Sequence, residues 1–192
     1  MGGAAPALSD RSASASSVIE LPDPCLVVLV GAAGSGKSTF AARLFAPDQV
    51  LSSDAYRRMV SGDQADQGAT KVAFKILHRE LDRRLRERLT TVIDATNVTS
   101  YARRAVVRVA VVHGVPAVAI VLDLDPALVQ ARNANRPGRI VPIPAVRAQL
   151  EDLERSLRRG ELAAEGFLAV HRVTSQADLD ALSVVALPSR DP

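Results

Sequence analysis

The residues with the clearest chemical potential lie at positions 31–39, where the sequence reads GAAGSGKST after the apolar run Leu26–Val30. This stretch fits the phosphate-binding loop pattern G-x-x-x-x-G-K-[ST], in the strand-to-helix setting that the pattern needs. Its glycines allow successive backbone N–H groups to point inward at phosphate oxygens, and the start of the next helix adds its positive dipole end. We therefore expect the chain to bind a nucleoside triphosphate.

Two side chains of this loop have individual roles. We expect Lys37 to reach the β- and γ-phosphates and Ser38 to supply an oxygen ligand to Mg²⁺. The predicted ligands are thus ATP, or another nucleoside triphosphate, and Mg²⁺. The loop residues expected to contact the nucleotide are Gly31, Gly34, Ser35, Gly36, Lys37, Ser38 and Thr39.

Two carboxylates follow other apolar runs. Asp54 comes after residues 49–52, and Asp94 closes residues 91–94. The carboxyl ends of parallel strands share one edge of a sheet, so both should lie near Lys37. Asp94 suits the carboxylate that holds Mg²⁺ or its waters, and Asp54 is then available to accept a proton from an attacking hydroxyl. The alternative is that Asp54 caps the helix expected over residues 55–60.

Three arginines follow the fourth predicted strand, at Arg132, Arg136 and Arg139. Arg132 and Arg136 are one helical turn apart and share a face, while Arg139 lies beyond a Pro-Gly turn. Lids of P-loop kinases carry such arginines, which stabilise charge during transfer. A solvated basic helix end is the alternative interpretation.

The elements that must position these residues alternate in type. Apolar runs predict strands over residues 26–30, 49–52, 91–94, 116–122 and 167–173, with a further candidate at 183–187. Helices are expected from the phosphate loop to near residue 47, and over residues 55–60, 69–89, 101–113, 126–135 and 144–159. This alternation predicts an α/β fold in which helices flank a parallel sheet of about five strands.

Length and composition agree with one such domain. The chain has 192 residues, is 47% hydrophobic but only 3% aromatic, and carries a net charge of +3. We expect residues 1–22, rich in Gly, Ala and Ser, to form a flexible tail and residues 23–188 to form a single domain. The single cysteine, Cys25, favours a reducing compartment, and no apolar run reaches membrane-spanning length, so a cytoplasmic protein without membrane contact is expected.

Several motifs together resemble the polynucleotide 5′-kinase module of bacterial end-healing proteins. They are the runs SSDAYR at 52–57, DQADQ at 63–67 and VIDATN at 92–97, the arginines named above, and EGF at 165–167. The resemblance covers residues 26 to about 180. It implies a P-loop kinase fold with an arginine-bearing lid, and an ATP- and Mg²⁺-dependent phosphotransferase that acts on the 5′-hydroxyl end of DNA or RNA in nucleic-acid repair.

The resemblance also assigns roles to single residues. Asp54 matches the family's base, and Arg57 matches the arginine that contacts the acceptor's phosphate. Arg132, Arg136 and Arg139 match its lid arginines. The chain departs from the family at Gly62 and Ala65, where Asp and Asn are usual. In that family the kinase module commonly precedes phosphatase and ligase modules in one polypeptide. This chain is expected instead to work alone or with separate proteins of those kinds.

Two other functions remain open from the residues. A P-loop kinase that acts on a small-molecule hydroxyl (a sugar, nucleoside or antibiotic), or a toxin-like kinase, would also pair a phosphate loop with an Asp after the second strand. Arg57 favours an acceptor that carries a phosphate. A nucleotide-dependent regulatory module without turnover would be favoured if Lys37 or Asp54 were missing, and both are present.

Overall fold

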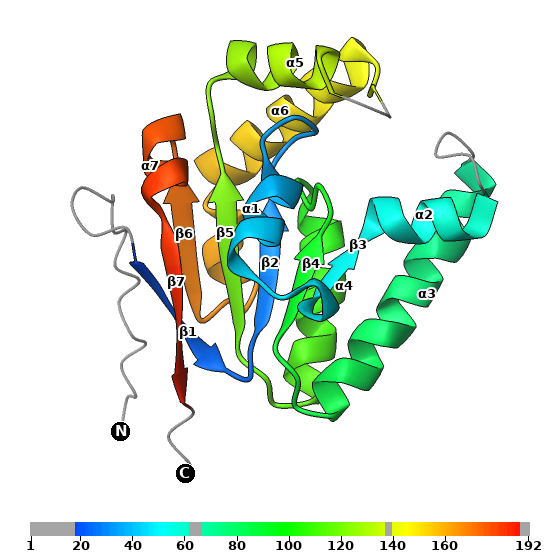
Figure 1. The fold of residues 1–192 in the computed structure, drawn as a ribbon, viewed down its shortest axis with the longest axis vertical. Helices are drawn as coiled ribbons and strands as arrows, with labels where there is room; N and C mark the ends of the chain where they lie inside the picture. Colours follow the sequence, from blue (N-terminus) through cyan, green and yellow to red (C-terminus); the bar gives the residue numbers. More distant parts are fainter. Residues whose placement is uncertain (1–17, 62–66, 137–139, 189–192) are drawn as a thin grey trace.

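A computed structural model describes residues 18–61, 67–136 and 140–188 of the chain (Figure 1). The elements in chain order are β1 (Val18–Asp23), β2 (Leu26–Val30), α1 (Lys37–Leu44), η1 (Pro47–Gln49), β3 (Val50–Ser52), α2 (Ser53–Ser61), α3 (Gln67–Arg86), β4 (Thr91–Asp94), α4 (Ser100–Val112), β5 (Ala117–Leu122), α5 (Pro126–Ala134), α6 (Ile143–Arg158), η2 (Glu161–Ala164), β6 (Ala169–Val173), α7 (Gln176–Ala181) and β7 (Ser183–Pro188).

The central sheet has five parallel strands in the order β3-β4-β2-β5-β6. Its register places Val28 of β2 beside Ile93 of β4 and Ala119 of β5. The predicted parallel α/β sheet is therefore confirmed, and the predicted limits of β2 and β4 coincide with the observed ones. Because all strands run the same way, the segments that follow β2, β3 and β4 meet at one edge of the sheet.

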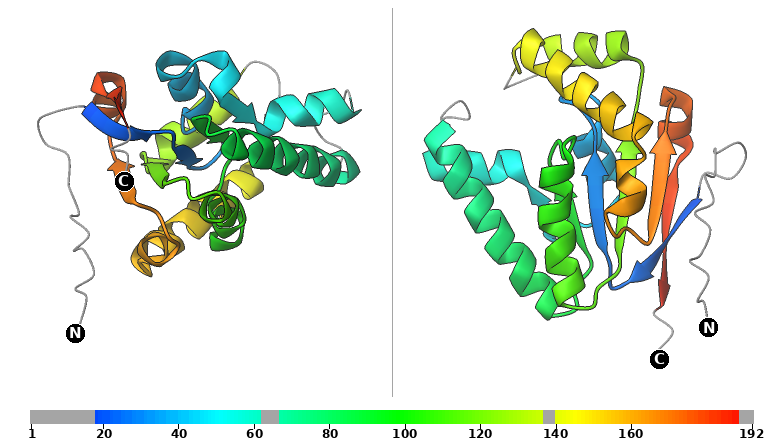
Figure 2. Two further views of the ribbon diagram at one scale, coloured as in Figure 1. Left: turned by 90° about the horizontal axis from the view of Figure 1, so that it is seen from below. Right: turned by 180° about the vertical axis from the view of Figure 1, so that it is seen from behind.

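Each face of the sheet is covered by its own apolar core, because successive side chains of a strand point to opposite faces. Leu26, Val28 and Val30 of β2 join a core with α3, α4 and α6. Val27 and Leu29 join a second core with α1, α5, α7 and β1. Figure 2 shows α3, α4 and α6 on the first face when the molecule is seen from behind. With both faces covered, the strands read as continuous apolar runs.

The strand β1 corrects one prediction. Residues 18–22 were expected in the flexible tail, but they belong to β1, which pairs in parallel with β7 in a separate two-stranded sheet. The buried side chains of Ile19 and Leu21 alternate with exposed ones and pack into the second core. This burial stabilises a strand despite the Ser- and Ala-rich segment before it. The rest of the expected tail, residues 1–17, lies outside the described residues.

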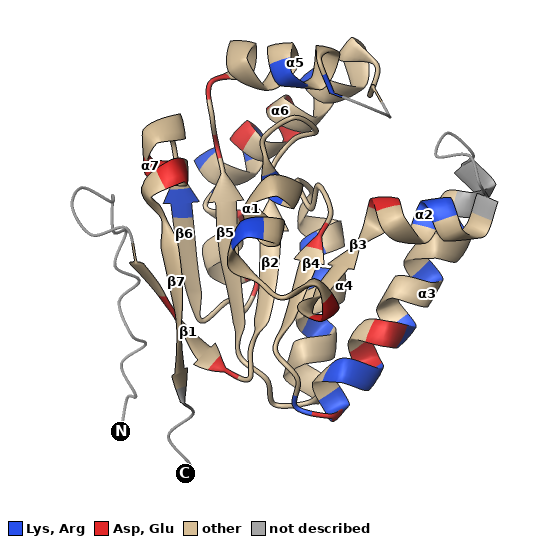
Figure 3. Cartoon of the chain, in the orientation of Figure 1, with Lys and Arg blue, Asp and Glu red and all other residues tan. Residues whose placement is uncertain are grey.

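Charged side chains are absent from the buried strands β2 and β5 at the centre of the sheet. In the central sheet, charged positions lie at strand ends, whereas α3 carries basic and acidic positions along its length (Figure 3). Cys25 is buried beside β2, and burial raises the pKa of its thiol to about 11, which suits a packing residue. Among the described helices, none combines the length and the apolar character that crossing a membrane requires.

Candidate active site

Apart from Gly31, Ser35 and Arg139, the sequence-predicted site residues line a pocket of about 680 Å³ at the carboxyl ends of β2, β3 and β4. Lys37 and Ser38 reach it from the phosphate loop, Asp54 from the start of α2, and Asp94 from the end of β4. Arg132 and Arg136 reach it from α5 and the segment just after it. In Figure 1, α5 stands above this edge of the sheet and α2 stands to one side of it.

Lys37 lies deep in the phosphate loop. Its Nζ donates hydrogen bonds to the carbonyl oxygens of Gly31 and Ala32, both at 2.8 Å, and to Ser35 Oγ at 3.3 Å. Burial lowers the pKa of the ammonium to about 8, the carboxylate of Asp94 acts against this shift, and Arg136 adds to it. Gly31 and Ser35 thus support the lysine from behind, whereas Gly34, Gly36, Ser38 and Thr39 line the pocket.

Two glycines of the loop are required by its shape. Gly34 and Gly36 have φ values of 90° and 95°, a region that side chains rarely adopt. A Cβ atom on Gly34 would lie 2.3 Å from the carbonyl oxygen of Val129. Helix α5 therefore packs directly on the phosphate loop, which brings Arg132 of this helix close to the loop.

Ser38 and Asp94 form the candidate metal site. Ser38 Oγ donates a hydrogen bond of 2.8 Å to Asp94 Oδ2, and Asp94 is 6% exposed. A hydroxyl and a carboxylate are oxygen donors of the kind that Mg²⁺ prefers, and Mg²⁺ usually keeps waters and phosphate oxygens as its other ligands. In the described part of the chain, no group of three or more His, Cys, Asp or Glu could hold a metal. The two-residue site fits Mg²⁺ brought by a nucleotide.

Asp54 is held between two guanidinium groups. Its Oδ1 is 2.8 Å from Arg57 Nη2, and its Oδ2 is 3.2 Å from Arg136 Nη2. Arg57 also donates to the backbone oxygen of Ser53 at 3.1 Å and to Ser53 Oγ at 2.9 Å. Helix α2 begins at Ser53, so Asp54 lies within its first turn and not at the cap position that the alternative interpretation required.

The other two predicted lid arginines are Arg132, which lies in the pocket, and Arg139. Arg132 Nη2 donates a 2.6 Å hydrogen bond to Gln176 Oε1, which joins α5 to α7 across the pocket. Arg139 lies outside the described residues, as do Gly62 and Ala65. Asn133, buried on α5, exchanges hydrogen bonds with the backbone of Val141, at 2.7 Å to its oxygen and 3.1 Å from its nitrogen. These two hydrogen bonds attach Val141 to the end of α5, close in sequence to Arg136.

Several pocket residues were missed from the sequence. Gln149 of α6 accepts a hydrogen bond of 2.8 Å from the backbone N–H of Ala33 in the phosphate loop. Helix α7, which was not predicted, supplies Gln176 and Leu179, and α3 supplies Phe74. Their neighbours in the sequence carry no motif, and only the folded chain brings them to the loop.

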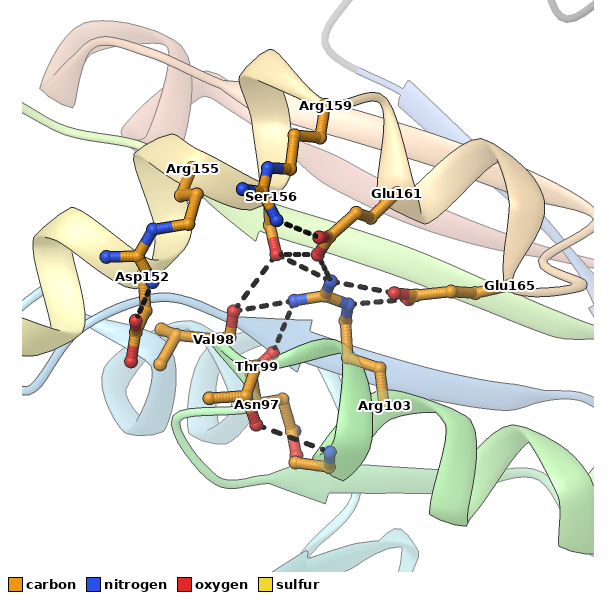
Figure 4. A network of polar contacts seen from close by, with 11 residues as sticks. Asn97, Val98, Thr99, Arg103, Asp152, Arg155, Ser156, Arg159, Glu161 and Glu165 are labelled. Atoms are coloured by element: carbon orange, nitrogen blue, oxygen red, sulfur yellow. Dashed lines mark hydrogen bonds and ion pairs between the residues drawn. The ribbon is translucent and has the colours of Figure 1, made fainter.

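A buried polar network supports the segment after β4 from behind (Figure 4). Arg103 is fully buried and donates to both carboxylate oxygens of Glu165, at 2.6 and 2.8 Å. It also donates to the backbone oxygens of Asn97 and Val98, at 3.1 and 2.8 Å. Ser156 of α6 accepts a further hydrogen bond of 2.9 Å from Arg103. The network connects the segment that follows Asp94 to α4 and α6. Glu165, as the carboxylate partner of Arg103, has a structural role in it.

Comparisons with known proteins agree with this geometry. A family model described as "AAA domain" matches residues 26–159. A search of curated proteins finds no significant match. Among solved structures, a chain of the Pnkp1/Rnl/Hen1 RNA repair complex is 25% identical with a TM-score of 0.63, and the match covers 72% of this chain and 47% of that chain. This chain therefore spans about half the length of that repair protein.

Two more distant structures share the fold. A gluconokinase from Sinorhizobium meliloti 1021 is 20% identical with a TM-score of 0.52, over 84% of this chain and 89% of that chain. A chain of the PezAT chromosomal toxin–antitoxin system of Streptococcus pneumoniae is 16% identical with a TM-score of 0.57, over 85% and 70%. The predicted P-loop kinase fold and the resemblance to the kinase module of end-healing proteins are confirmed. The chain belongs to the AAA domain family, and its fold is that of a kinase-like P-loop phosphotransferase.

Proposed function

We propose that this protein is a kinase that transfers the γ-phosphate of ATP to the 5′-hydroxyl end of a polynucleotide, DNA or RNA. The observation that carries the proposal is the position of Asp54, which shares one pocket with Lys37 and contacts both Arg57 and Arg136. A base for a hydroxyl, a cation for the acceptor's phosphate and a cation for the transferred phosphate thus lie together.

The donor side of the pocket suits a triphosphate. Lys37 and the backbone N–H groups of the loop would bind the β- and γ-phosphates, with Arg132 and Arg136 above them. Ser38 and Asp94 would hold Mg²⁺ or its waters; when bound, Mg²⁺ neutralises negative charge on the β- and γ-phosphates. Lys37 and Asp94 are buried, so water screens their charge interactions less than those of the more exposed Asp54 and Arg136.

The reaction needs one proton acceptor from the protein. The carboxylate of Asp54 takes the proton of the 5′-hydroxyl as that oxygen forms its bond to the γ-phosphorus. The bond between the γ-phosphorus and the bridging oxygen breaks, and that oxygen leaves with ADP. Arg136 contacts Asp54 and lowers the pKa of Lys37. Its guanidinium would stabilise negative charge on the transferred phosphate.

Two observations support a nucleic-acid acceptor over a small alcohol. Arg57 is 13% exposed and lies next to Asp54, where its guanidinium supplies a positive charge for a phosphate beside the base. The similar RNA repair protein is 25% identical, whereas the gluconokinase likeness concerns the fold alone. By analogy with that complex, we propose that the protein acts with separate repair proteins, such as a phosphatase or a ligase.

Transfer of labelled phosphate from ATP tests the proposal. The acceptors are a 5′-hydroxyl oligonucleotide, the same oligonucleotide with a 5′-phosphate, and a panel of sugars, nucleosides and aminoglycosides. We expect label on the 5′-hydroxyl oligonucleotide alone, and a rate of labelling that falls by about 10² or more with Asp54→Asn. Transfer to a small alcohol at equal or higher kcat/KM would replace the proposal with a small-molecule kinase.

A further inference from the structure

Phe74 is an aromatic side chain of the pocket to which the proposed chemistry gives no role. It lies on α3 and lines the pocket together with Asp54 and Arg57. Its side chain is 36% exposed, although a phenyl ring in water is unfavourable. Leu77, Leu81 and Leu85 of the same helix are buried in the first core, so α3 already has an apolar face without this ring.

Aromatic side chains are scarce here, which makes the position of Phe74 informative. The chain has four Phe, two Tyr and no Trp. The rings of Phe40 and Phe45 lie 6.3 Å apart, Phe167 is buried, and Tyr56 packs against the first core. Tyr101 on α4 is 87% exposed but does not line the pocket. Among the described residues, Phe74 is the one aromatic that is both exposed and in the pocket.

The pocket separates into two sides about the phosphate loop. Arg132 belongs to α5, which packs on the phosphate loop. Gln176 and Leu179 belong to α7, where the backbone oxygen of Leu179 accepts a hydrogen bond from Arg43 of α1. Asp54, Arg57 and Phe74 belong to α2 and α3, which pack against each other on the other side. Phe74 therefore lies on the side of the base that must meet the acceptor.

We infer that Phe74 forms a subsite that stacks the nucleobase of the acceptor's 5′-terminal nucleotide. The inference rests on the proposed function and extends it, since each chemical part of a nucleotide then has its own residue: the hydroxyl meets Asp54, the phosphate meets Arg57, and the base meets Phe74. Every nucleobase has a π-face, so stacking on a single phenyl ring accepts any base. The enzyme should therefore prefer an acceptor with a base at its 5′ end over an abasic one and show little preference among the four bases.

The test compares a nucleoside 3′-phosphate with the corresponding abasic sugar 3-phosphate, which has the same hydroxyl and phosphate but no base. Phe74→Ala should lower kcat/KM for the nucleoside 3′-phosphate by about 5- to 150-fold, the range that base–aromatic stacking supplies. It should leave kcat/KM for the abasic acceptor and KM for ATP unchanged. Phe74→Trp should return kcat/KM for the nucleoside 3′-phosphate to the wild-type value. Tyr101→Ala, an equivalent change at an exposed aromatic outside the pocket, should alter neither acceptor.

The two proposals fail in different ways. If wild type phosphorylates the nucleoside 3′-phosphate and Phe74→Ala affects both acceptors equally, or neither, the base subsite is wrong and the kinase proposal stands. A wild-type enzyme that phosphorylates no nucleotide acceptor overturns both. Equal thermal stability of wild type, Phe74→Ala and Tyr101→Ala ensures that any loss reflects binding and not folding.

Discussion

Asp54 Oδ2 lies 3.2 Å from Arg136 Nη2, across 82 residues of sequence. This ion pair joins the helix that follows β3 to the segment that follows α5, and so connects the two sides of the pocket. Arg136 also lowers the pKa of Lys37, although burial of the lysine is the larger cause. One guanidinium therefore acts on both the proposed base and the proposed phosphate-binding lysine, which suits a group that stabilises the transferred phosphate between them.

The phosphate loop provides the first prediction. Lys37→Ala should lower the transfer rate by about 10² to 10³, because it removes a positioned charge from the transition state. Ser38→Ala should raise the Mg²⁺ concentration needed for half-maximal transfer, and chelation of Mg²⁺ should abolish transfer by wild type. Lys75→Ala, at an exposed lysine of α3, serves as the control. Wild-type turnover by Lys37→Ala would exclude the triphosphate from this loop.

The proposed base is tested by Asp54→Asn. Loss of a positioned proton acceptor should reduce kcat by about 10² to 10⁴ while the Kd for ATP stays nearly unchanged. The exposed Asp48 gives a control, since Asp48→Asn should keep full activity. Rates, ATP binding and Tm are measured on the same preparations. A large fall in Tm with intact activity per folded molecule would instead assign Asp54 to the stability of α2.

The buried network predicts a stability effect at some distance from the pocket. Arg103→Met leaves the carboxylate of Glu165 buried without its guanidinium partner, which should lower the free energy of unfolding by about 3 to 5 kcal/mol. Arg104→Met, at the exposed neighbour, should change it by less than about 0.5 kcal/mol. Urea denaturation measures both variants. Equal stability of the two would show that the network contributes no more than an exposed arginine does.

The sequence predicted those parts of the structure that depend on local signals. The loop at 31–39 and the strands β2 and β4 have continuous apolar runs and a fixed glycine pattern, so their limits and their meeting point at the sheet edge followed directly. Strand β1 did not follow, because its two buried residues come directly after a Gly-, Ala- and Ser-rich segment and its partner β7 is far along the chain.

Long-range contacts in the site could not be predicted in the same way. The spacing of Arg132 and Arg136 indicated a shared face, but not that one would contact Gln176 and the other Asp54. Gln149 reaches the phosphate loop from 116 residues away, and neither it nor Phe74 belongs to a motif. These positions depend on how α3, α6 and α7 pack against the sheet.

The most direct measurement of the central claim is the preference of the enzyme for a phosphate next to the reacting nucleotide. If Asp54 holds a 5′-hydroxyl, the nearest fixed anion of a polynucleotide is the 3′-phosphate of the same nucleotide, and Arg57 should bind it. The quantity measured is kcat/KM for a nucleoside 3′-monophosphate divided by that for the unphosphorylated nucleoside. We predict a ratio far above one for wild type, a sharp fall with Arg57→Ala, and partial recovery with Arg57→Lys, since lysine keeps the positive charge but not the planar guanidinium that also contacts Ser53 and Asp54. A ratio near one that Arg57→Ala does not change would contradict a polynucleotide acceptor.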